Sequence, residues 1–159
     1  MKKNKKDWGK VKCILGIDPG LSGALAFYYP DTKKTFVIDM PLRDGIVDPG
    51  ALRMAIEYHN PQSAIIERVH SMPKQGVKST FTFGFAAGTI FGVVGSNMRT
   101  VLVQPRAWKK YWGLDSDKEL SIAMAKDIAP GCADRLKRKK DHNRAEAILI
   151  AIYGARTLT

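Results

Sequence analysis

The chain has 159 residues, 45% of them hydrophobic, which is enough for one domain with a core of its own and excludes a disordered chain. Its 26 Lys and Arg residues outnumber the 15 Asp and Glu residues, so the net charge is +11. An excess of this size indicates a polyanionic partner, nucleic acid in the first place and an acidic membrane surface in the second.

The two cysteines, Cys13 and Cys132, form neither a disulfide framework nor a pair with metal-ligand spacing. An apolar stretch at residues 11–17 follows the lysine-rich start and imitates a signal peptide, but Asp18 and Pro19 interrupt it too early. We therefore expect a protein that is not secreted and that works in a reducing compartment, the cytoplasm or an organelle matrix.

The first part of the chain predicts a basic arm and three strands. Residues 1–10 are rich in lysine and lack an apolar period, so we expect a flexible arm before a single domain at residues 11–159. Strands are predicted at residues 11–18, 22–29 and 35–40. Because the links between them are short, the three strands must form an antiparallel meander.

The rest of the chain alternates helices and strands. Asp48 can cap a helix at about residues 49–59, and residues 63–67 follow as a fourth strand. The order βββαβαβα predicts an α/β fold with a mixed five-stranded sheet and helices on both faces. The remaining predicted elements are a loop at 69–78, a glycine-dotted helix at 79–97, a fifth strand at 100–103, a short helix from 105, an amphipathic helix at 117–128, a basic loop at 129–140 and a closing helix at 141–156.

Residues 79–98 carry no charge and are long enough to span a bilayer. The stretch contains four glycines and no leucine and is only modestly hydrophobic, so we expect a buried helix and no membrane partner. Gly84, Gly88 and Gly92 recur every four residues, which makes one side of the helix nearly flat. A flat side suits either packing within the chain or a twin helix in a second subunit.

Three acidic residues stand among apolar segments. Asp18 closes the first strand, Glu67 closes the fourth, and Glu146 lies within the apolar closing helix. Acids in such places are costly unless cations or hydrogen bonds compensate them. If the first and fourth strands are neighbours, Asp18 and Glu67 converge at one sheet edge, which the closing helix can also reach. Clustered carboxylates suit Mg²⁺, and Mn²⁺ should be able to replace it.

The start of the closing helix offers further candidate ligands. His142 and Asn143 stand four and three residues before Glu146 and share its helix face, whereas Asp141 reaches the same site only from a cap or loop conformation. Taken singly, Asp18 could begin a turn, Glu67 could form a surface pair and Asp141 could be an N-cap. Taken together, these residues favour a two-metal phosphodiesterase site, which needs no Ser or Cys nucleophile.

The sequences around these acids resemble those of a known family. The segments GIDPGLSG at 16–23, IERV at 66–69 and KDHNRAEA at 140–147, with QP at 104–105, WK at 108–109 and DKE at 117–119, are similar to those of the RuvC-type Holliday junction resolvases, particularly the phage and organellar subgroup. The resemblance covers residues 12–156 and implies the RNase H-like fold. It also implies a homodimer that makes paired symmetric nicks in four-way DNA junctions with Mg²⁺ or Mn²⁺, leaving 5′-phosphate and 3′-hydroxyl ends.

The resemblance carries the family's metal ligands to Asp18, Glu67, one residue of the 141–143 turn, and Glu146. Bacterial members commonly have two aspartates three residues apart on the last helix, but this chain has Asn143 at that spacing. His142 is the better substitute and Asp141 the next. The final acid is glutamate rather than aspartate, which lengthens its reach by one methylene.

Basic residues near the predicted site are candidate DNA contacts, although a run of charges is ordinarily a solvated surface. In the family, the loop after Glu67 approaches the junction centre, where His70 or Met72 could wedge between bases. Trp108 and Trp112 are interpreted as core or surface anchors, with base stacking as the alternative. The cationic candidates are Lys74, Lys78, Lys109, Arg138, Lys139, Lys140 and Arg144, besides the lysines at positions 2 to 12.

Three other functions remain open. A sugar-kinase or actin-like ATPase shares this sheet, but it needs two such lobes around its nucleotide. A non-catalytic junction-binding module could keep the fold without cleavage. A related RNase H-like nuclease could act on RNA–DNA hybrids or other branched DNA.

Overall fold

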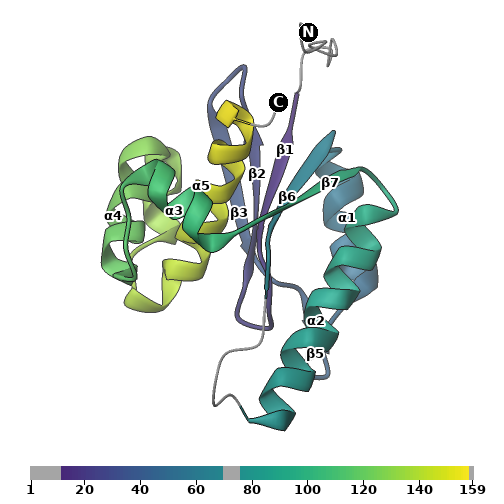
Figure 1. Cartoon of the computed structure of the whole chain (residues 1–159). Helices are drawn as coiled ribbons and strands as arrows, with labels where there is room; N and C mark the ends of the chain where they lie inside the picture. Colours follow the sequence, from purple (N-terminus) through teal and green to yellow (C-terminus); the bar gives the residue numbers. More distant parts are fainter. Residues whose placement is uncertain (1–11, 70–75, 158–159) are drawn as a thin grey trace, which may run out of the picture.

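The computed structural model describes residues 12–69 and 76–157, and a five-stranded sheet runs through its centre (Figure 1). In space the strands follow the order β3-β2-β1-β6-β7. The first three pair antiparallel as a meander, β6 runs parallel to β1, and β7 runs parallel to β6. The predicted mixed sheet is thereby confirmed. Its strands are β1 (Ile14–Asp18), β2 (Ala24–Tyr29), β3 (Lys34–Asp39), β6 (Ser63–Glu67) and β7 (Arg99–Val103).

A small hairpin that the sequence reasoning did not anticipate follows β3. β4 (Leu42–Arg43) pairs antiparallel with β5 (Ile46–Val47). Asp44 and Gly45 form the turn with positive φ angles of 52° and 77°. Asp-Gly is a strong signal for such two-residue turns, so this hairpin was readable from the sequence.

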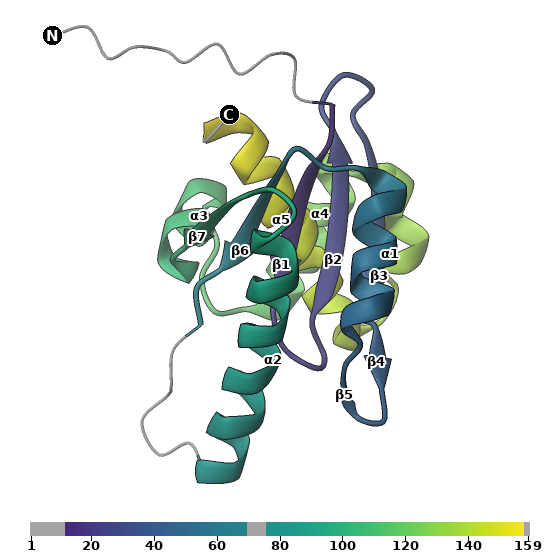
Figure 2. The same cartoon turned by 90° about the vertical axis from the view of Figure 1, so that its right-hand side faces the viewer.

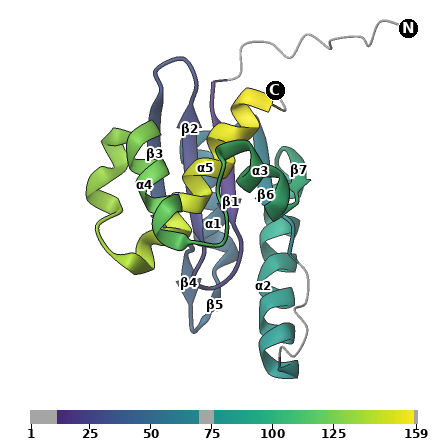
Figure 3. The same ribbon diagram turned by 60° about the vertical axis from the view of Figure 1, so that its left-hand side comes forward.

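Helices cover both faces of the sheet, as predicted (Figures 1 and 3). α1 and α2 lie on one face, while α5 crosses the other face with α3 and α4 packed around it. The predicted basic loop contains two short 3-10 turns, at Pro130–Arg135 and Lys139–Asp141. The helices are α1 (Pro49–His59), α2 (Val77–Gly95), α3 (Pro105–Trp112), α4 (Lys118–Ile128) and α5 (His142–Thr157).

Local signals set the ends of α1. The Asp48 carboxylate accepts hydrogen bonds from the backbone N–H groups of Gly50 and Ala51, so it caps the helix as predicted. The helix ends at Asn60, which adopts the left-handed conformation with a φ of 47°.

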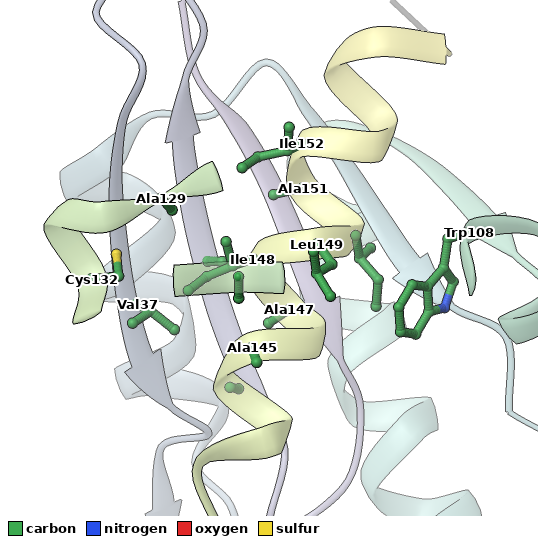
Figure 4. Packing of buried hydrophobic residues seen from close by; sticks show 14 of the residues in the cluster. Val37, Trp108, Ala129, Cys132, Ala145, Ala147, Ile148, Leu149, Ala151 and Ile152 are labelled. Atoms are coloured by element: carbon green, nitrogen blue, oxygen red, sulfur yellow. The ribbon is translucent and has the colours of Figure 1, made fainter. Parts of the chain in front are cut away.

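α5 lies directly on β1. Leu15 and Ile17 face the apolar cluster under α1 and α2, so the intervening Gly16 faces α5. A Cβ atom at Gly16 would overlap backbone atoms of Ala147 and Ala151. Figure 4 shows the small residues of α5 turned toward the strands, with Trp108 of α3 packed at the side. Glycine is therefore required at position 16 by close packing rather than by backbone conformation.

The prediction that α2 is a buried helix is wrong for the single chain. Its buried residues are Ala86, Ile90 and Val94, while Phe81 and Phe85 are exposed. The helix packs on the sheet along one side only, and its N-terminal half projects past the end of the sheet (Figure 2). Near its C-terminal end, Gly92 and Val93 line a hollow together with residues of α1.

By length and composition alone α2 could cross a membrane, and 17% of its apolar window is buried in the structure. Helices in the cores of soluble proteins satisfy the same two criteria. The feature to be explained is therefore a largely exposed helical surface that carries no charge beyond Lys78 in its first turn.

Candidate active site

β1 and β6 bring two of the predicted acids to one edge and one face of the sheet. Ile17 pairs with Ile66 in the parallel register, so the next residues, Asp18 and Glu67, stand at the ends of adjacent strands. Both isoleucines face the α1–α2 layer. Because side chains alternate along a strand, Asp18 and Glu67 are turned toward α3 and α5.

The third acid comes from α5. Glu146 precedes Ala147, whose backbone lies against Gly16 of β1, and only 13% of the Glu146 side chain is exposed. The contact at Gly16 therefore holds this part of α5 against the strand that ends in Asp18. Asp18 itself is 8% exposed.

The electrostatics of Asp18 show that the three acids act on one another. Burial raises the pKa of the Asp18 carboxyl well above its usual range, and the negative charges of Glu146 and Glu67 raise it further. Lys109 and Lys118 act in the opposite direction. The strand register puts Asp18 and Glu67 at adjacent strand ends, and Glu146 is close enough to act electrostatically on Asp18.

α3 contributes two consecutive residues to this cluster. The Trp108 Nε1–H donates a hydrogen bond to Glu67 Oε2 at 2.7 Å, and Lys109 Nζ lies 3.6 Å from Glu146 Oε1. Trp108 is fully buried, so its interpretation as a core anchor is confirmed, but its link to Glu67 was missed. The sequence did indicate that a buried tryptophan here would need a hydrogen-bond acceptor, because its indole N–H is a donor.

Two arginines bind the carboxylate of Asp141. Its Oδ1 and Oδ2 atoms accept hydrogen bonds from the Arg138 side chain and backbone, and Oδ1 also accepts one from Arg144. The hydrogen bond with the Arg138 guanidinium is the main cause that lowers the pKa of Asp141 to about 2. The capping alternative therefore describes the geometry of Asp141, and its role as a metal ligand stays a prediction.

The next two residues of the turn have other contacts. His142 Nδ1 lies 3.1 Å from the backbone oxygen of Lys139, and the Asn143 side-chain N–H group donates to the backbone oxygen of Ser22 at 2.6 Å. Both residues line an open hollow of about 510 Å³ that Lys118 also lines. Lys118 also acts electrostatically on Asp18, although Asp18, Glu67 and Glu146 do not line this hollow. Sequence reasoning gave Lys118 no role, because its neighbourhood depends on long-range packing.

The carboxylates of the cluster are chemically suited to a divalent cation, although the three acids do not form a preformed metal site. Over residues 12–69 and 76–157, no three His, Cys, Asp or Glu side chains stand close enough to hold a metal ion. The cluster nevertheless offers carboxylate oxygens, which hard cations prefer, and Asp18 is buried beside two like charges. A bound dication would offset this repulsion.

The structure separates the basic candidates by their surroundings. Lys78 lies exposed in the first turn of α2, and Lys140 lines the hollow. Lys139 pairs with Glu119 at 3.1 Å, and both side chains are largely exposed. The guanidinium of Arg138 holds Asp141, although about half of its side chain remains exposed.

Arg144 differs from these cations. Its guanidinium binds both carboxylate oxygens of Asp39 at 2.6 Å and also contacts Asp141, and its side chain is 12% exposed. Arg144 thus joins β3 to the start of α5, and its contact with DNA stays a prediction. His70, Met72 and Lys74 lie outside the described residues, as does the lysine-rich arm.

Comparisons with known proteins place the chain beside DNA-junction enzymes. No protein-family model matches it. It is 30% identical over 121 residues to the chloroplastic Holliday junction resolvase MOC1 of Chlamydomonas reinhardtii, an alignment that covers 74% of this chain and 13% of that protein. The chain thus spans a small part of the length of this curated relative.

Two solved structures have similar architecture. RuvC of T. thermophilus, in complex with a Holliday junction substrate, superposes with a TM-score of 0.63 and 17% identity, covering 91% of this chain and 95% of RuvC. The Fowlpox virus resolvase, in complex with Holliday junction DNA, superposes with a TM-score of 0.52 and 18% identity, covering 92% of this chain and 98% of the resolvase. At these identities the likeness establishes the fold.

Proposed function

We propose that the chain is a RuvC-type resolvase of the RNase H-like superfamily, a metal-dependent endonuclease that resolves four-way DNA junctions. The main support is the carboxylate cluster, in which β1, β6 and α5 each contribute one acid and lysines stand beside them. The sequence similarity to a resolvase over most of this chain points the same way.

In this proposal Asp18, Glu67 and Glu146 hold Mg²⁺, and Mn²⁺ can replace it. Bound there, a pair of such ions would activate a water molecule and stabilise charge on the departing 3′ oxygen. His142 is the proposed further ligand from the 141–143 turn, because Asp141 is held by arginines.

The chain's own cations bind and orient the substrate. Lys109 lies 3.6 Å from Glu146 Oε1 and Lys118 acts electrostatically on Asp18, so both would draw the scissile phosphodiester toward the carboxylates. Lys140 would bind a neighbouring phosphate across the hollow. The products are nicked strands with 5′-phosphate and 3′-hydroxyl ends.

A homodimer is the proposed working unit, with α2 at its interface. Phe81, Phe85, Gly88 and Gly92 follow the spacing of one helix side, and all are exposed. A Cβ atom at either of these glycines would meet nothing within 4 Å. An uncharged surface of this kind suits a second copy of the same helix, and two copies would place two active sites on one symmetric junction.

Both cysteines are free and buried, as a reducing compartment allows. We propose the cytoplasm or an organelle matrix as the place of action. The similar protein of Chlamydomonas reinhardtii is described as chloroplastic.

The decisive experiment compares the native chain with Asp18→Asn on a mobile four-way junction in Mg²⁺. We expect paired symmetric nicks from the native chain, and junction binding without cleavage from the variant. Linear duplex and an RNA–DNA hybrid serve as control substrates. Equal cleavage by both proteins would contradict the site, preferential cleavage of the hybrid would favour a different nuclease, and binding without cleavage by the native chain would indicate a binding module.

A further inference from the structure

Trp108 and Lys109 touch two different carboxylates of the cluster from the same turn of α3. Lys109 brings a positive charge to Glu146, whereas Trp108 brings a neutral hydrogen-bond donor to Glu67. The two contacts differ in consequence. A lysine competes with a metal ion for negative charge, but an indole N–H leaves the charge of the carboxylate intact.

The donor is held rigidly. Trp108 is fully buried in the core cluster between the sheet and α5, and the next turn of α3 is also fastened to α5. There the Trp112 Nε1–H donates to the backbone oxygen of Leu149 at 3.1 Å, and Tyr111 packs edge-on against Tyr153. Figure 4 shows the Trp108 ring wedged beside α5. Its N–H therefore has a fixed direction relative to β6.

The acceptor, by contrast, belongs to a long side chain with several rotatable bonds. Glu67 is the last residue of β6, and a glutamate has three side-chain torsions whose freedom is lost when the carboxylate is fixed. The hydrogen bond at 2.7 Å restrains Oε2 and so reduces the number of side-chain conformations that Glu67 can adopt. Fewer conformations leave fewer directions for Oε1. A ligand oriented in advance binds a metal more tightly than one that must be ordered during binding.

We propose that Trp108 is a positioning residue, which orients the Glu67 carboxylate for divalent metal through its indole N–H. The inference rests on the metal site proposed above. Outer contacts of this kind typically contribute about 10–100-fold to metal affinity or activity. We expect a loss of at least about tenfold in Mn²⁺ affinity when the N–H is removed.

The test measures Mn²⁺ binding in the absence of DNA by electron paramagnetic resonance. Trp108→Phe removes the donor, and Trp112→Phe is the matched control, because it removes an indole N–H from the same helix whose acceptor is a backbone oxygen. Trp108→Phe should weaken Mn²⁺ binding at least about tenfold, and Trp112→Phe should change it less than about twofold. Junction binding without metal should be the same in both variants, since a general loss of structure would reduce it.

Because Trp108 is buried, a phenylalanine there could disturb folding. Site-specific incorporation of benzothienylalanine, in which sulfur replaces the ring N–H, keeps the shape of tryptophan and removes the donor alone. In the unaltered protein, the indole ¹⁵N–¹H resonance of Trp108 should move during a Mg²⁺ titration while that of Trp112 stays in place. Glu67→Gln should abolish this movement.

The outcomes separate this inference from the proposed function. Native Mn²⁺ affinity in the benzothienylalanine protein, with weakened binding in Glu67→Gln, would overturn the role of Trp108 and leave the metal site standing. Equal losses in Trp108→Phe and Trp112→Phe would also overturn it. Absence of Mn²⁺ binding by the native protein would remove the metal site, and the inference and the proposed function would fail together.

Discussion

Asp141 ties the start of α5 to the basic segment that precedes it. The residue is 3% exposed, and Arg138 and Arg144 donate to its carboxylate. Its pKa of about 2 lies below the ordinary value of 3.8, so the charged form is favoured by folding. The stability that Asp141 contributes is therefore present above pH 3.8 and is lost as the pH falls toward 2.

The first prediction follows from the lowered pKa of Asp141. Asp141→Asn should lower the free energy of unfolding at pH 7, on the order of 1–2 kcal/mol, because the arginines lose their charged partner. It should also flatten the loss of stability between pH 4 and 2. Urea unfolding at several pH values measures both effects.

Asp134→Asn is the control for this prediction. Asp134 also pairs with a cation, Lys137, but 88% of its side chain is exposed. Its removal should leave the unfolding curves close to those of the native chain. If the free energy of unfolding of Asp141→Asn fell between pH 4 and 2 as steeply as that of the native chain, Asp141 would not belong to a stabilising ion pair.

At the level of elements, the contact between α5 and β1 positions the site. Gly16 lets the helix backbone approach the strand, and this contact sets the depth at which Glu146 stands beside Asp18. The strand register alone places Asp18 and Glu67, but Glu146 depends on this packing of helix on sheet.

Gly16→Ala should therefore affect both stability and catalysis. The added methyl overlaps the backbone of Ala147 and Ala151, which cannot move aside as a flexible side chain would. We expect a loss of about 1–3 kcal/mol in the free energy of unfolding and slower junction cleavage because Glu146 is displaced.

Gly131→Ala provides the matched substitution, since a Cβ atom there would meet nothing within 4 Å. It should be close to neutral in thermal unfolding and in cleavage. If Gly16→Ala unfolded at the native temperature and cut junctions at the native rate, the close packing of α5 on β1 would not be what positions Glu146.

For the whole molecule, α2 is the surface that one copy leaves uncovered. Its buried residues, Ala86, Ile90 and Val94, lie two residues away from Gly84, Gly88 and Gly92, which is about 200° around a helix. The glycine side therefore lies opposite the packed side. This arrangement explains how the same helix can cover the sheet and meet a second copy.

Gly88→Glu tests the dimer without threatening the fold. The position is exposed and glutamate favours helix by up to about 1 kcal/mol over glycine, so the single chain should stay folded. A charge in an apolar interface is costly. Sedimentation at micromolar concentration should show a dimer for the native chain and a monomer for the variant, and the paired nicks should become single.

Leu120→Glu is the corresponding control, because it introduces the same charge at an exposed apolar position of α4, on the other face of the sheet. It should remain dimeric. A native chain that sediments as a monomer, or a Gly88→Glu variant that remains dimeric, would argue against α2 as the interface.

Much of the fold and part of the candidate site could be predicted from the sequence, because those features depend on local pattern. Strand alternation set the faces of β1 and β6, and with them the common orientation of Asp18 and Glu67. The cap of α1 followed from the aspartate at position 48, directly before Pro49, and the prediction of a polyanionic partner followed from the net charge of +11. Each of these depends on residues that are close in sequence or on composition.

Only the tertiary structure decided which groups meet across long separations. Trp108 and Glu67 are 41 residues apart, and nothing in either segment specifies their hydrogen bond. The choice of Arg138 and Arg144 as partners of Asp141, and the exposure of α2, likewise depend on how the helices pack around the sheet. A residue's type limits the contacts it can make, but the free energy of packing the whole chain selects among them.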